Sequence, residues 1–298
     1  MWFLLAILSA IALGFYDIAK KRSLTDNPVA PVLLLSICCS CVLLAPMLIV
    51  SRLAPGTMEG SLFYVPHIDL TTHLFIALKS VIVLASWVFA YVAMKHLPIT
   101  LVTPVNATRP MWTLIGALLI FDERLTGWQW AGVVATFGSL MLFSLVERRE
   151  GIDFTHNKWV VCLAIAILLG AMSGLYDKHL MRRYDHNAVQ VFYTFYQAVL
   201  MAIVTAIIWW PHRHESPLHW RWSIALIALF LVISDFVYLL ALSYPESLVS
   251  VVSIVRRSSV IVSFAYGAMM LHERNITAKA FCLVGVLAGM LCLFIGSL

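Results

Sequence analysis

Five charged residues interrupt long apolar stretches of this 298-residue chain: Lys79, Arg109, Asp235, Arg256 and Arg257. A charged side chain at the centre of a membrane helix costs about 2.5 to 3.5 kcal/mol, so such residues usually face a polar cavity. Four cations against one carboxylate predict a cationic cavity, and the planar guanidinium of arginine suits carboxylate or phosphate groups. We therefore expect a site for an anionic or zwitterionic solute, with Arg109 and Arg257 as its principal ligands. In the structural alternative, Asp235 pairs with Lys79 or one arginine, and the other arginines reach the membrane surface or bond to carbonyls of broken helices.

Polar and aromatic residues near these charges extend the candidate site. Asn106 precedes Arg109 by three positions and Ser253 precedes Arg257 by four, so each pair lies on one face of its helix. Serine hydroxyls can instead bond to carbonyls of their own helix. The aromatic candidates, which could stack on an organic solute or anchor at the membrane surface, are Trp87, Tyr91, Tyr193, Tyr196 and Tyr238.

Two Tyr-Asp pairs are candidates for gating the cavity or for proton coupling. Tyr16 and Asp17 lie near the end of one apolar stretch, and Tyr176 and Asp177 lie near the end of another, each pair preceding basic residues. Ion pairs with those basic residues are the favoured interpretation of the aspartates, whereas gating or surface anchoring is favoured for the tyrosines.

Glu123 and Glu273 lie in short turns, where we expect a structural role. Each can accept backbone N–H groups at the start of the following helix. The six cysteines all lie in apolar stretches, and neither they nor the histidines show the spacing of a metal site. The sequence therefore predicts no metal, no cofactor and no catalytic residue.

The elements that must hold these residues are membrane-spanning helices. Apolar residues make up 62% of the chain and charged residues 12%, compared with about 45 to 50% and about 25% in soluble domains. The apolar stretches are continuous over the roughly 18 to 25 residues that cross a bilayer as a helix, whereas barrel strands alternate. We expect ten spans, at residues 2–19, 29–51, 73–94, 99–121, 128–146, 159–176, 188–210, 222–242, 246–271 and 276–296.

An internal repeat divides these spans into two halves. The motif AxxxGxYD at residues 10–17 recurs as GxxxGxYD at 170–177, and residues 97–109 resemble residues 244–256, with Arg109 opposite Arg256. Because each half holds five spans, an odd number, the second half must enter the membrane in the opposite sense. The predicted fold is an all-α membrane protein of ten transmembrane helices in two inverted five-helix repeats: residues 1–146, a connecting loop at 147–158, and residues 159–298. Such repeats can expose a midplane site to alternate sides of the membrane.

These motifs resemble those of the drug/metabolite transporter superfamily, in particular its EamA-type branch. The resemblance covers almost the whole chain and rests on Leu97-Pro98, on Arg109-Pro110 followed by Glu123-Arg124, and on Glu273-Arg274 in the second half. The second half departs from the pattern at Val260, where the position equivalent to Pro110 would be expected to hold a proline. The resemblance implies a central cavity lined mainly by spans 1, 3, 4, 6, 8 and 9, with spans 5 and 10 at the periphery.

The expected function is secondary transport of a small organic solute, such as an amino acid or an organic acid, across the cell (inner) membrane. The lipid bilayer and the solute are the expected partners, solute exchange or a coupling ion such as a proton is the expected energy source, and the assembly is a monomer or a homodimer. The alternatives are a flippase for a lipid-linked carrier and, less favoured, a membrane-embedded enzyme.

The net charge of +5 is scattered over loops and indicates no nucleic-acid partner. Lysine and arginine in the loops favour termini outside the cell, whereas the resemblance implies cytoplasmic termini.

Overall fold

Long apolar segments fold as helices in lipid because a helix satisfies its own backbone hydrogen bonds. The computed structural model describes residues 2–54, 56, 61, 63–112, 115, 126–148, 157–181, 183–243, 255–271, 273 and 275–296. Within these residues it contains ten α-helices, one 3₁₀ turn (Trp210–His212) and no strand. The α-helices are α1 (Trp2–Leu24), α2 (Val29–Leu53), α4 (Leu70–His96), α5 (Ile99–Ala107), α7 (Gly127–Arg148), α8 (Lys158–Met181), α9 (His186–Ile208), α10 (Trp222–Ser243), α12 (Ser259–Met270) and α13 (Ile276–Ile295).

The outer surface of the helix bundle is suited to lipid. In the described part of the chain, α2, α4, α7, α9 and α13 are each long and apolar enough to cross a membrane, and α8 and α10 contain shorter apolar segments. Large apolar side chains point outward, such as Val42 with 72% and Phe281 with 73% of their surface exposed. Exposed apolar surface on this scale is stable in a bilayer rather than in water. The predicted all-helical membrane fold is therefore confirmed.

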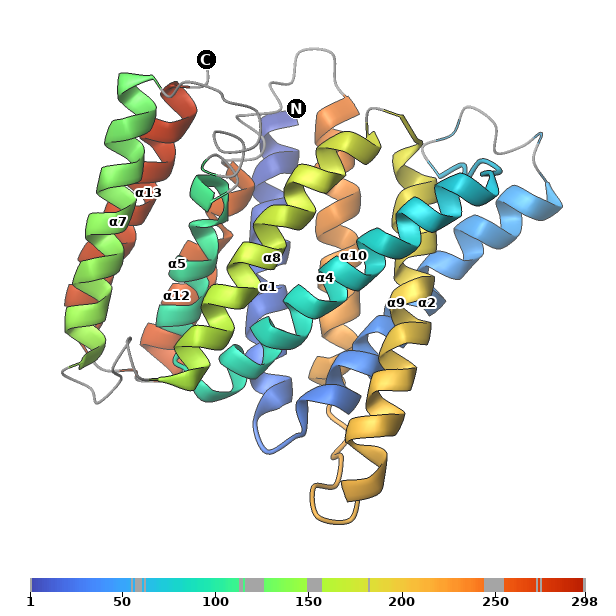
Figure 1. Cartoon of the computed structure of the whole chain (residues 1–298), viewed down its shortest axis with the longest axis horizontal. Coiled ribbons are helices and arrows are strands. Elements are labelled where there is room, and N and C mark those ends of the chain that lie inside the picture. The colour runs from blue at the N-terminus through green and yellow to red at the C-terminus, as the bar shows by residue number, and fades with distance from the viewer. Residues whose placement is uncertain are drawn as a thin grey trace.

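The two repeats run in opposite directions through the bundle. The last helices of the repeats, α7 and α13, lie side by side (Figure 1). At one end of this pair the Thr126 hydroxyl donates to the Gly296 carbonyl at 3.2 Å, and at the other end Lys279 contacts Glu147 at 2.9 Å. The start of each helix thus meets the end of the other, as two inverted copies require.

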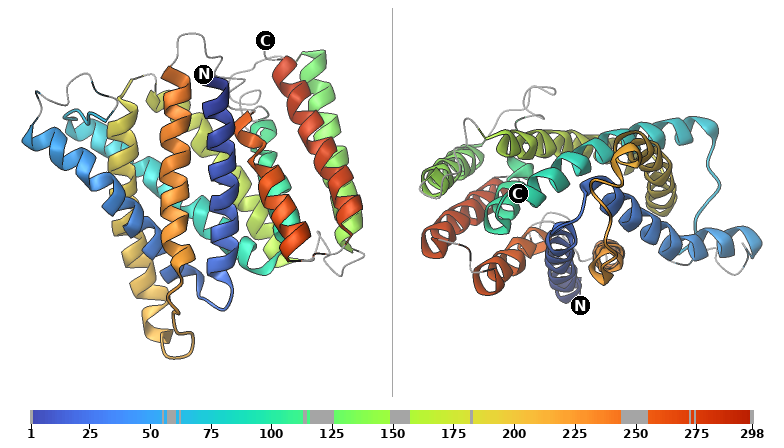
Figure 2. Two further views of the ribbon diagram at one scale, coloured as in Figure 1. Left: turned by 180° about the vertical axis from the view of Figure 1, so that it is seen from behind. Right: turned by 90° about the horizontal axis from the view of Figure 1, so that it is seen from below.

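The same inversion relates helices that are distant in sequence. The helix pair α1–α10 is held by Ser9 and Ser234, whose hydroxyl oxygens lie 3.1 Å apart, and its counterpart α8–α4 is held by Ser86, which donates to the Ala166 carbonyl at 2.7 Å. Figure 2 shows α7 and α13 on one side of these pairs and α2 and α9 on the other, and Figure 1 shows both chain ends at the same end of the bundle. An even number of spans predicts that placement of the ends.

Two predicted spans are interrupted near the middle of the bundle. Spans 99–121 and 246–271 were expected to be continuous, but α5 ends at Ala107 and α12 begins at Ser259. At the first interruption the Thr108 hydroxyl donates to the Val105 carbonyl at 2.7 Å, and at the second the Ser258 hydroxyl donates to the Val255 carbonyl at 2.6 Å. Hydroxyls that bond back to their own helix compete with the regular backbone pattern and bend it.

These interruptions correct the alignment of the two repeats. Thr108 and Ser258 occupy equivalent breaks, at the same offset that relates Glu123 to Glu273. Arg109, which follows the first break, therefore corresponds to Ser259 and not to Arg256. The arginines of the second repeat come before its break instead of after it.

Other boundaries agree with the sequence to within a few residues, with clear exceptions at two helix ends. Helix α1 continues to Leu24 instead of residue 19, and α8 continues to Met181 instead of 176.

Helix α4 begins at an Asp69 cap, whose carboxylate accepts the Thr72 N–H at 3.4 Å. Hydrogen bonds from Thr72 lower the pKa of this exposed carboxyl. Proline at position 98 ends α4 at the expected place.

Candidate solute cavity

A cavity of about 700 Å³ lies between the two repeats. Six helices contribute most of its lining: α1, α4, α5, α8, α10 and α12, the six that the resemblance implied. The expected periphery of the bundle needs one correction. Helix α7 supplies Gln129 and α13 supplies Met290, Leu293 and Phe294, so the fifth and tenth spans close part of the cavity wall.

Most of the candidate site residues surround this one cavity. Those in its lining are Tyr16, Asp17, Lys79, Trp87, Tyr91, Asn106, Arg109, Tyr193, Asp235, Arg256 and Arg257. Thr103, which shares a helical stripe with Asn106 and Arg109, also lines it. Charges predicted one by one from the sequence therefore form a single group in space.

Three aromatic candidates are placed elsewhere. The Tyr196 hydroxyl lies 2.7 Å from His73 Nδ1, and the Tyr176 hydroxyl donates to the Phe75 carbonyl at 3.2 Å. The Tyr238 ring stacks against the guanidinium of Arg256, whose central carbon lies 4.4 Å from the ring centre. None of the three is in the cavity lining, so their roles in solute contact, or in gating for Tyr176, stay predictions. Ser253, Glu123 and the side chain of Asp177 lie outside the described residues.

Both carboxylates in the described lining are paired with cations. Asp235 on α10 forms an ion pair with Arg256, which is the structural alternative for this aspartate. Asp17 pairs with Lys20 at 2.9 Å, three residues later on α1. The favoured interpretation of Asp17, an ion pair with a following basic residue, thus agrees with its geometry, although the pair faces the cavity and not the membrane surface.

Lys20 is a cavity residue that sequence reasoning missed. Only 4% of its side chain is exposed, and its ammonium lies 4.8 Å from the ring centre of Tyr16 and 5.3 Å from that of Tyr91. Aromatic faces attract cations, and most strongly where water is excluded. The Asp-Lys spacing next to an aromatic residue was a usable signal, but ending the first span at residue 19 placed Lys20 outside the membrane.

The arginines bring positive charge from both repeats to one place. Arg109 comes from the first repeat, and Arg256 and Arg257 come from the second, close enough for both Arg109 and Arg256 to act electrostatically on Arg257. Arg257 makes neither a hydrogen bond nor an ion pair within the described part of the chain. Five cationic side chains and two carboxylates of the described residues line the cavity, a net charge of +3.

A polar cluster joins both repeats at the end of the bundle where α4 meets α5. The Lys21 ammonium donates to the carbonyls of Met94 at 2.8 Å and Leu97 at 2.6 Å, at the end of α4. Glu273 accepts the backbone N–H groups of Ile99 at 2.9 Å and Thr100 at 3.1 Å, and also the Thr100 hydroxyl. We call Lys21, Thr100 and Glu273 the closed-end cluster. Because Leu24, Leu97 and Ile99 at this end have at most 1% of their surface exposed, we treat it as the closed end of the bundle.

Glu273 therefore acts on a different helix from the one expected. It was expected to accept N–H groups at the start of the helix that follows it, α13. Its partners instead lie at the start of α5, in the other repeat. The inverted repeat brings the turn after α12 beside the start of α5. The carboxylate therefore accepts the unpaired N–H groups at that helix start.

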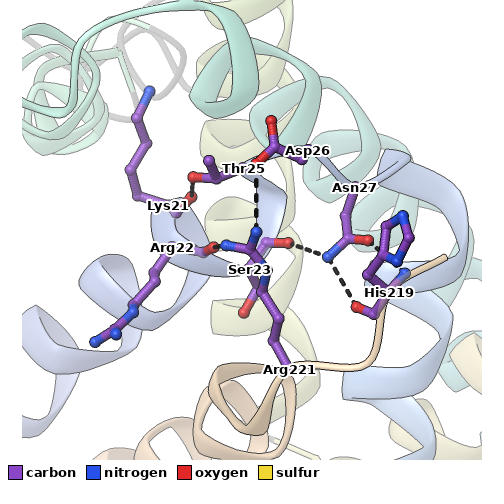
Figure 3. Close-up of polar contacts among 8 residues, drawn as sticks. All are labelled: Lys21, Arg22, Ser23, Thr25, Asp26, Asn27, His219 and Arg221. Carbon is purple, nitrogen blue, oxygen red and sulfur yellow. Dashed lines mark hydrogen bonds and ion pairs between the residues drawn. The ribbon is translucent and has the colours of Figure 1, made fainter.

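The loop after α9 is fastened to the same end of the bundle. Figure 3 shows Asn27, whose amide donates to the Ser23 and His219 carbonyls at 3.0 Å each, while its oxygen accepts the His219 N–H at 2.8 Å. Arg221 donates to the Arg22 carbonyl at 3.2 Å and contacts Asp26 at 3.3 Å. These contacts fix the turn between α1 and α2 against the second repeat.

Two inverted helical repeats that enclose a charged cavity between them are typical of membrane transporters. Comparison with family models agrees: the model of the EamA-like transporter family matches residues 1–145 and 157–295. The chain belongs to this family, within the drug/metabolite transporter superfamily, and is a multi-pass membrane transporter. The predicted family is thus confirmed. Comparison with curated proteins gives no match.

Proposed function

We propose that this transporter is a secondary carrier for a small organic solute that is anionic or zwitterionic, and that it works by alternating access. The observation that carries the proposal is the convergence of Arg109 with Arg256 and Arg257 on one cavity. Because the first arginine belongs to one repeat and the other two belong to its inverted partner, a solute between them contacts both halves of the molecule. Binding is thereby linked to the relative position of the repeats.

The charge balance of the cavity favours an anion. Asp17 is paired with Lys20 and Asp235 with Arg256, so neither described carboxylate in the lining is paired with Arg257. A guanidinium in a site of low dielectric gains more from a carboxylate or phosphate than it does at an exposed surface, and it binds such groups in a two-pronged geometry. A solute carboxylate beside Arg257 supplies the missing opposite charge.

Size and apolar lining indicate an organic solute of metabolite size. A volume of about 700 Å³ falls within the usual range for small-molecule sites, roughly 300 to 1,000 Å³. Trp87, Tyr91 and Tyr193 present aromatic surface, and Ser86, Thr103 and Asn106 present polar groups. Amino acids and organic acids carry a carboxylate and are small enough for this cavity, and many also carry an apolar part that could pack on the aromatic surface. Asp17 was a candidate for proton coupling and lies in the cavity lining. We therefore choose it as the residue for ion coupling.

The enzyme alternative gains no support from the site. The described lining residues include no histidine or cysteine that could serve as a base or nucleophile beside the carboxylates. Both carboxylates are held in ion pairs, which disfavours general acid–base chemistry. We therefore propose transport without catalysis, in the cell membrane.

The test is a binding screen followed by flux. The purified transporter is screened by thermal shift with succinate, L-glutamate, 4-hydroxybenzoate, L-phenylalanine, L-lysine and glucose. We expect an anionic or zwitterionic solute to raise the melting temperature and to move into liposomes that contain the protein. Arg109→Ala and Arg257→Ala should lose both signals, whereas Gly138→Ala, on the exposed face of α7 with no atom within 4 Å of a new Cβ, should keep them. Preference for L-lysine or glucose, or binding without flux, would refute the proposal.

A further inference from the structure

The guanidinium of Arg109 lies directly against the backbone of α8 at Gly170. A Cβ atom placed on Gly170 would lie 2.7 Å from Cζ, 2.8 Å from Nη1 and 2.9 Å from Nε of Arg109, whereas ordinary contacts of a Cβ are 3.4 to 4 Å. No residue with a side chain fits there while the guanidinium stays in place. We infer that Gly170 is a positioning residue, whose missing side chain sets where Arg109 meets the solute. This inference rests on the proposed function.

Packing between helices does not account for this glycine. Other glycines of the bundle accommodate neighbouring helices: a Cβ on Gly14 of α1 would lie 2.8 Å from Val262 Cγ1 and 3.0 Å from the Ser259 carbonyl oxygen of α12. At Gly132 of α7 it would lie 2.7 Å from the Gly289 carbonyl oxygen of α13. At Gly170 the three nearest atoms are all part of the charged group of Arg109. The space at this position is thus taken by a functional group and not by another helix.

The inverted repeat provides a comparison within the molecule. In the repeated motif, Gly170 of α8 corresponds to Ala10 of α1, and Gly174 corresponds to Gly14. Ala10 is buried, with 3% of its surface exposed, so α1 accommodates a Cβ at the equivalent position. A glycine at position 170 is therefore not a requirement of the repeat. Gly170 of the second repeat faces the arginine that follows the helix break in the first repeat. The residue equivalent to Arg109 in the second repeat is Ser259, which has a much smaller side chain.

Replacement of this glycine should change function and leave the fold intact. The contacting atoms belong to the far end of a flexible side chain, so Arg109 can move aside by more than half an ångström to restore ordinary contact distances. Alanine also favours helix over glycine by about 1 kcal/mol. Displacement of a binding group by about 1 Å can cost up to roughly 100-fold in activity. Gly170→Ala should therefore fold normally and bind its anion poorly.

The experiment measures anion affinity and flux for Gly170→Ala, with Gly138→Ala as the matched control. The probes are the anions and zwitterions of the same panel, namely succinate, L-glutamate, 4-hydroxybenzoate and L-phenylalanine. We expect Gly170→Ala to raise KM by about ten-fold or more, with a smaller change in kcat and an unchanged melting temperature without solute. Gly138→Ala should match the wild type in all three measurements.

A second pair of variants separates positioning from general damage to α8. Lysine at position 109 keeps the positive charge but lacks the planar group that contacts Gly170. Adding Gly170→Ala to Arg109→Lys should therefore cost at most about two-fold in affinity, less than it costs the wild type. Equal losses in both backgrounds, or no loss in the wild type, would overturn the role of Gly170. If Gly170→Ala binds normally while Arg109→Ala does not, only this inference fails. If wild type binds no panel member, or if Arg109→Ala binds as well as wild type, the proposed function fails as well.

Discussion

At the scale of single residues, the cavity shows how charges are held inside a membrane. Lys20 pairs with Asp17 and lies against two tyrosine faces, and Arg256 contacts both Asp235 and Tyr238. Each of these cations thus has an acidic partner and an aromatic one, which lowers the cost of burial. Arg257 has neither an ion pair nor a ring contact among the described residues. The charges that stabilise the fold and the charge available to a solute are therefore different residues.

Gln197 offers a residue-scale prediction away from the cavity. Its side chain on α9 is fully buried, and neither its oxygen nor its nitrogen finds a hydrogen-bond partner within the described residues. A buried amide without partners costs about 1 to 3 kcal/mol. Gln197→Met, which keeps the side-chain length, should raise the free energy of unfolding by about 1 kcal/mol or more, seen as a higher melting temperature in detergent. A lower melting temperature, with transport lost, would mean that the amide has a partner in another conformation.

Residue types predicted the site better than residue positions did. A charge inside an apolar stretch is visible in the sequence, and all five such residues line the cavity. The tyrosines were harder to assign because a tyrosine on a membrane helix can face a cavity, another helix or lipid. Tyr196 shows this, since its hydroxyl reaches His73 on α4, a contact that no local spacing predicts.

At the scale of elements, α7 and α13 form a closely packed pair. The Ser139 side chain lies against Gly285, and Thr136 lies against Gly289, so small residues let the two helices approach closely. Small residues four positions apart, such as Gly285 and Gly289, are typical of such packing. The sequence did not indicate that Glu147 and Lys279, which both have no exposed surface, form an ion pair between these helices. Glu147 was expected in the connecting loop at 147–158, and Lys279 lies only three residues inside the predicted span 276–296.

This buried pair leads to a prediction for the α7–α13 unit. Lys279→Met alone leaves the Glu147 carboxylate without its cation, and removal of one partner from a buried pair typically costs about 3 to 5 kcal/mol. The double variant Glu147→Leu with Lys279→Met should regain most of that loss, because apolar residues can replace a buried ion pair. Thermal unfolding of the four proteins measures this cycle, and flux should be retained in the double variant. If the double variant is less stable than either single one, the pair is not an isolated structural contact.

The helix breaks mark the limit of prediction at this scale. Thr108 and Ser258 read as ordinary polar residues within apolar spans, and a serine or threonine in a helix usually leaves it continuous. Only the structure shows both hydroxyls bonded to carbonyls three residues earlier. The repeat alignment from sequence failed at the same place, since Arg109 and Arg256 look equivalent until the breaks are matched.

At the scale of the whole molecule, the repeats are inverted but not in identical surroundings. Helix α1 packs closely on α12 through Gly14, whereas the equivalent region of α8 lies against the Arg109 side chain. Two copies of one bundle in different arrangements are what alternating access requires, since exchange of the arrangements exposes the cavity to the other side. The odd number of spans in each repeat predicted the inversion from sequence. The difference between the repeats depends on long-range packing and could not be predicted.

The closed-end cluster is where this exchange can be tested. Glu273 holds the start of α5 through two backbone N–H groups and the Thr100 hydroxyl, so one carboxylate links the second repeat to the first. If this end opens during transport, Glu273→Ala weakens the closed arrangement. Hydrogen bonds to a charged group contribute about 1.5 to 3 kcal/mol, and about 1.4 kcal/mol changes a population ten-fold. A cysteine at Ser173, in the cavity wall on α8, should then react about ten-fold faster with a membrane-impermeant thiol reagent added from the closed side.

Labelling in sealed vesicles of each orientation makes the assay specific for one side. The same vesicles without Ser173→Cys correct for the six native cysteines, and melting temperatures show whether the variants fold. Thr100→Val removes only the hydroxyl contact, so it should shift labelling in the same direction by a smaller factor. Unchanged labelling from the closed side in both variants would show that the Glu273 contact does not limit opening. Glu273 contacts α5, and we expect no contact with the solute. Faster labelling with unchanged anion affinity would therefore show that Glu273 controls the exchange of arrangements, whereas the arginines bind the solute.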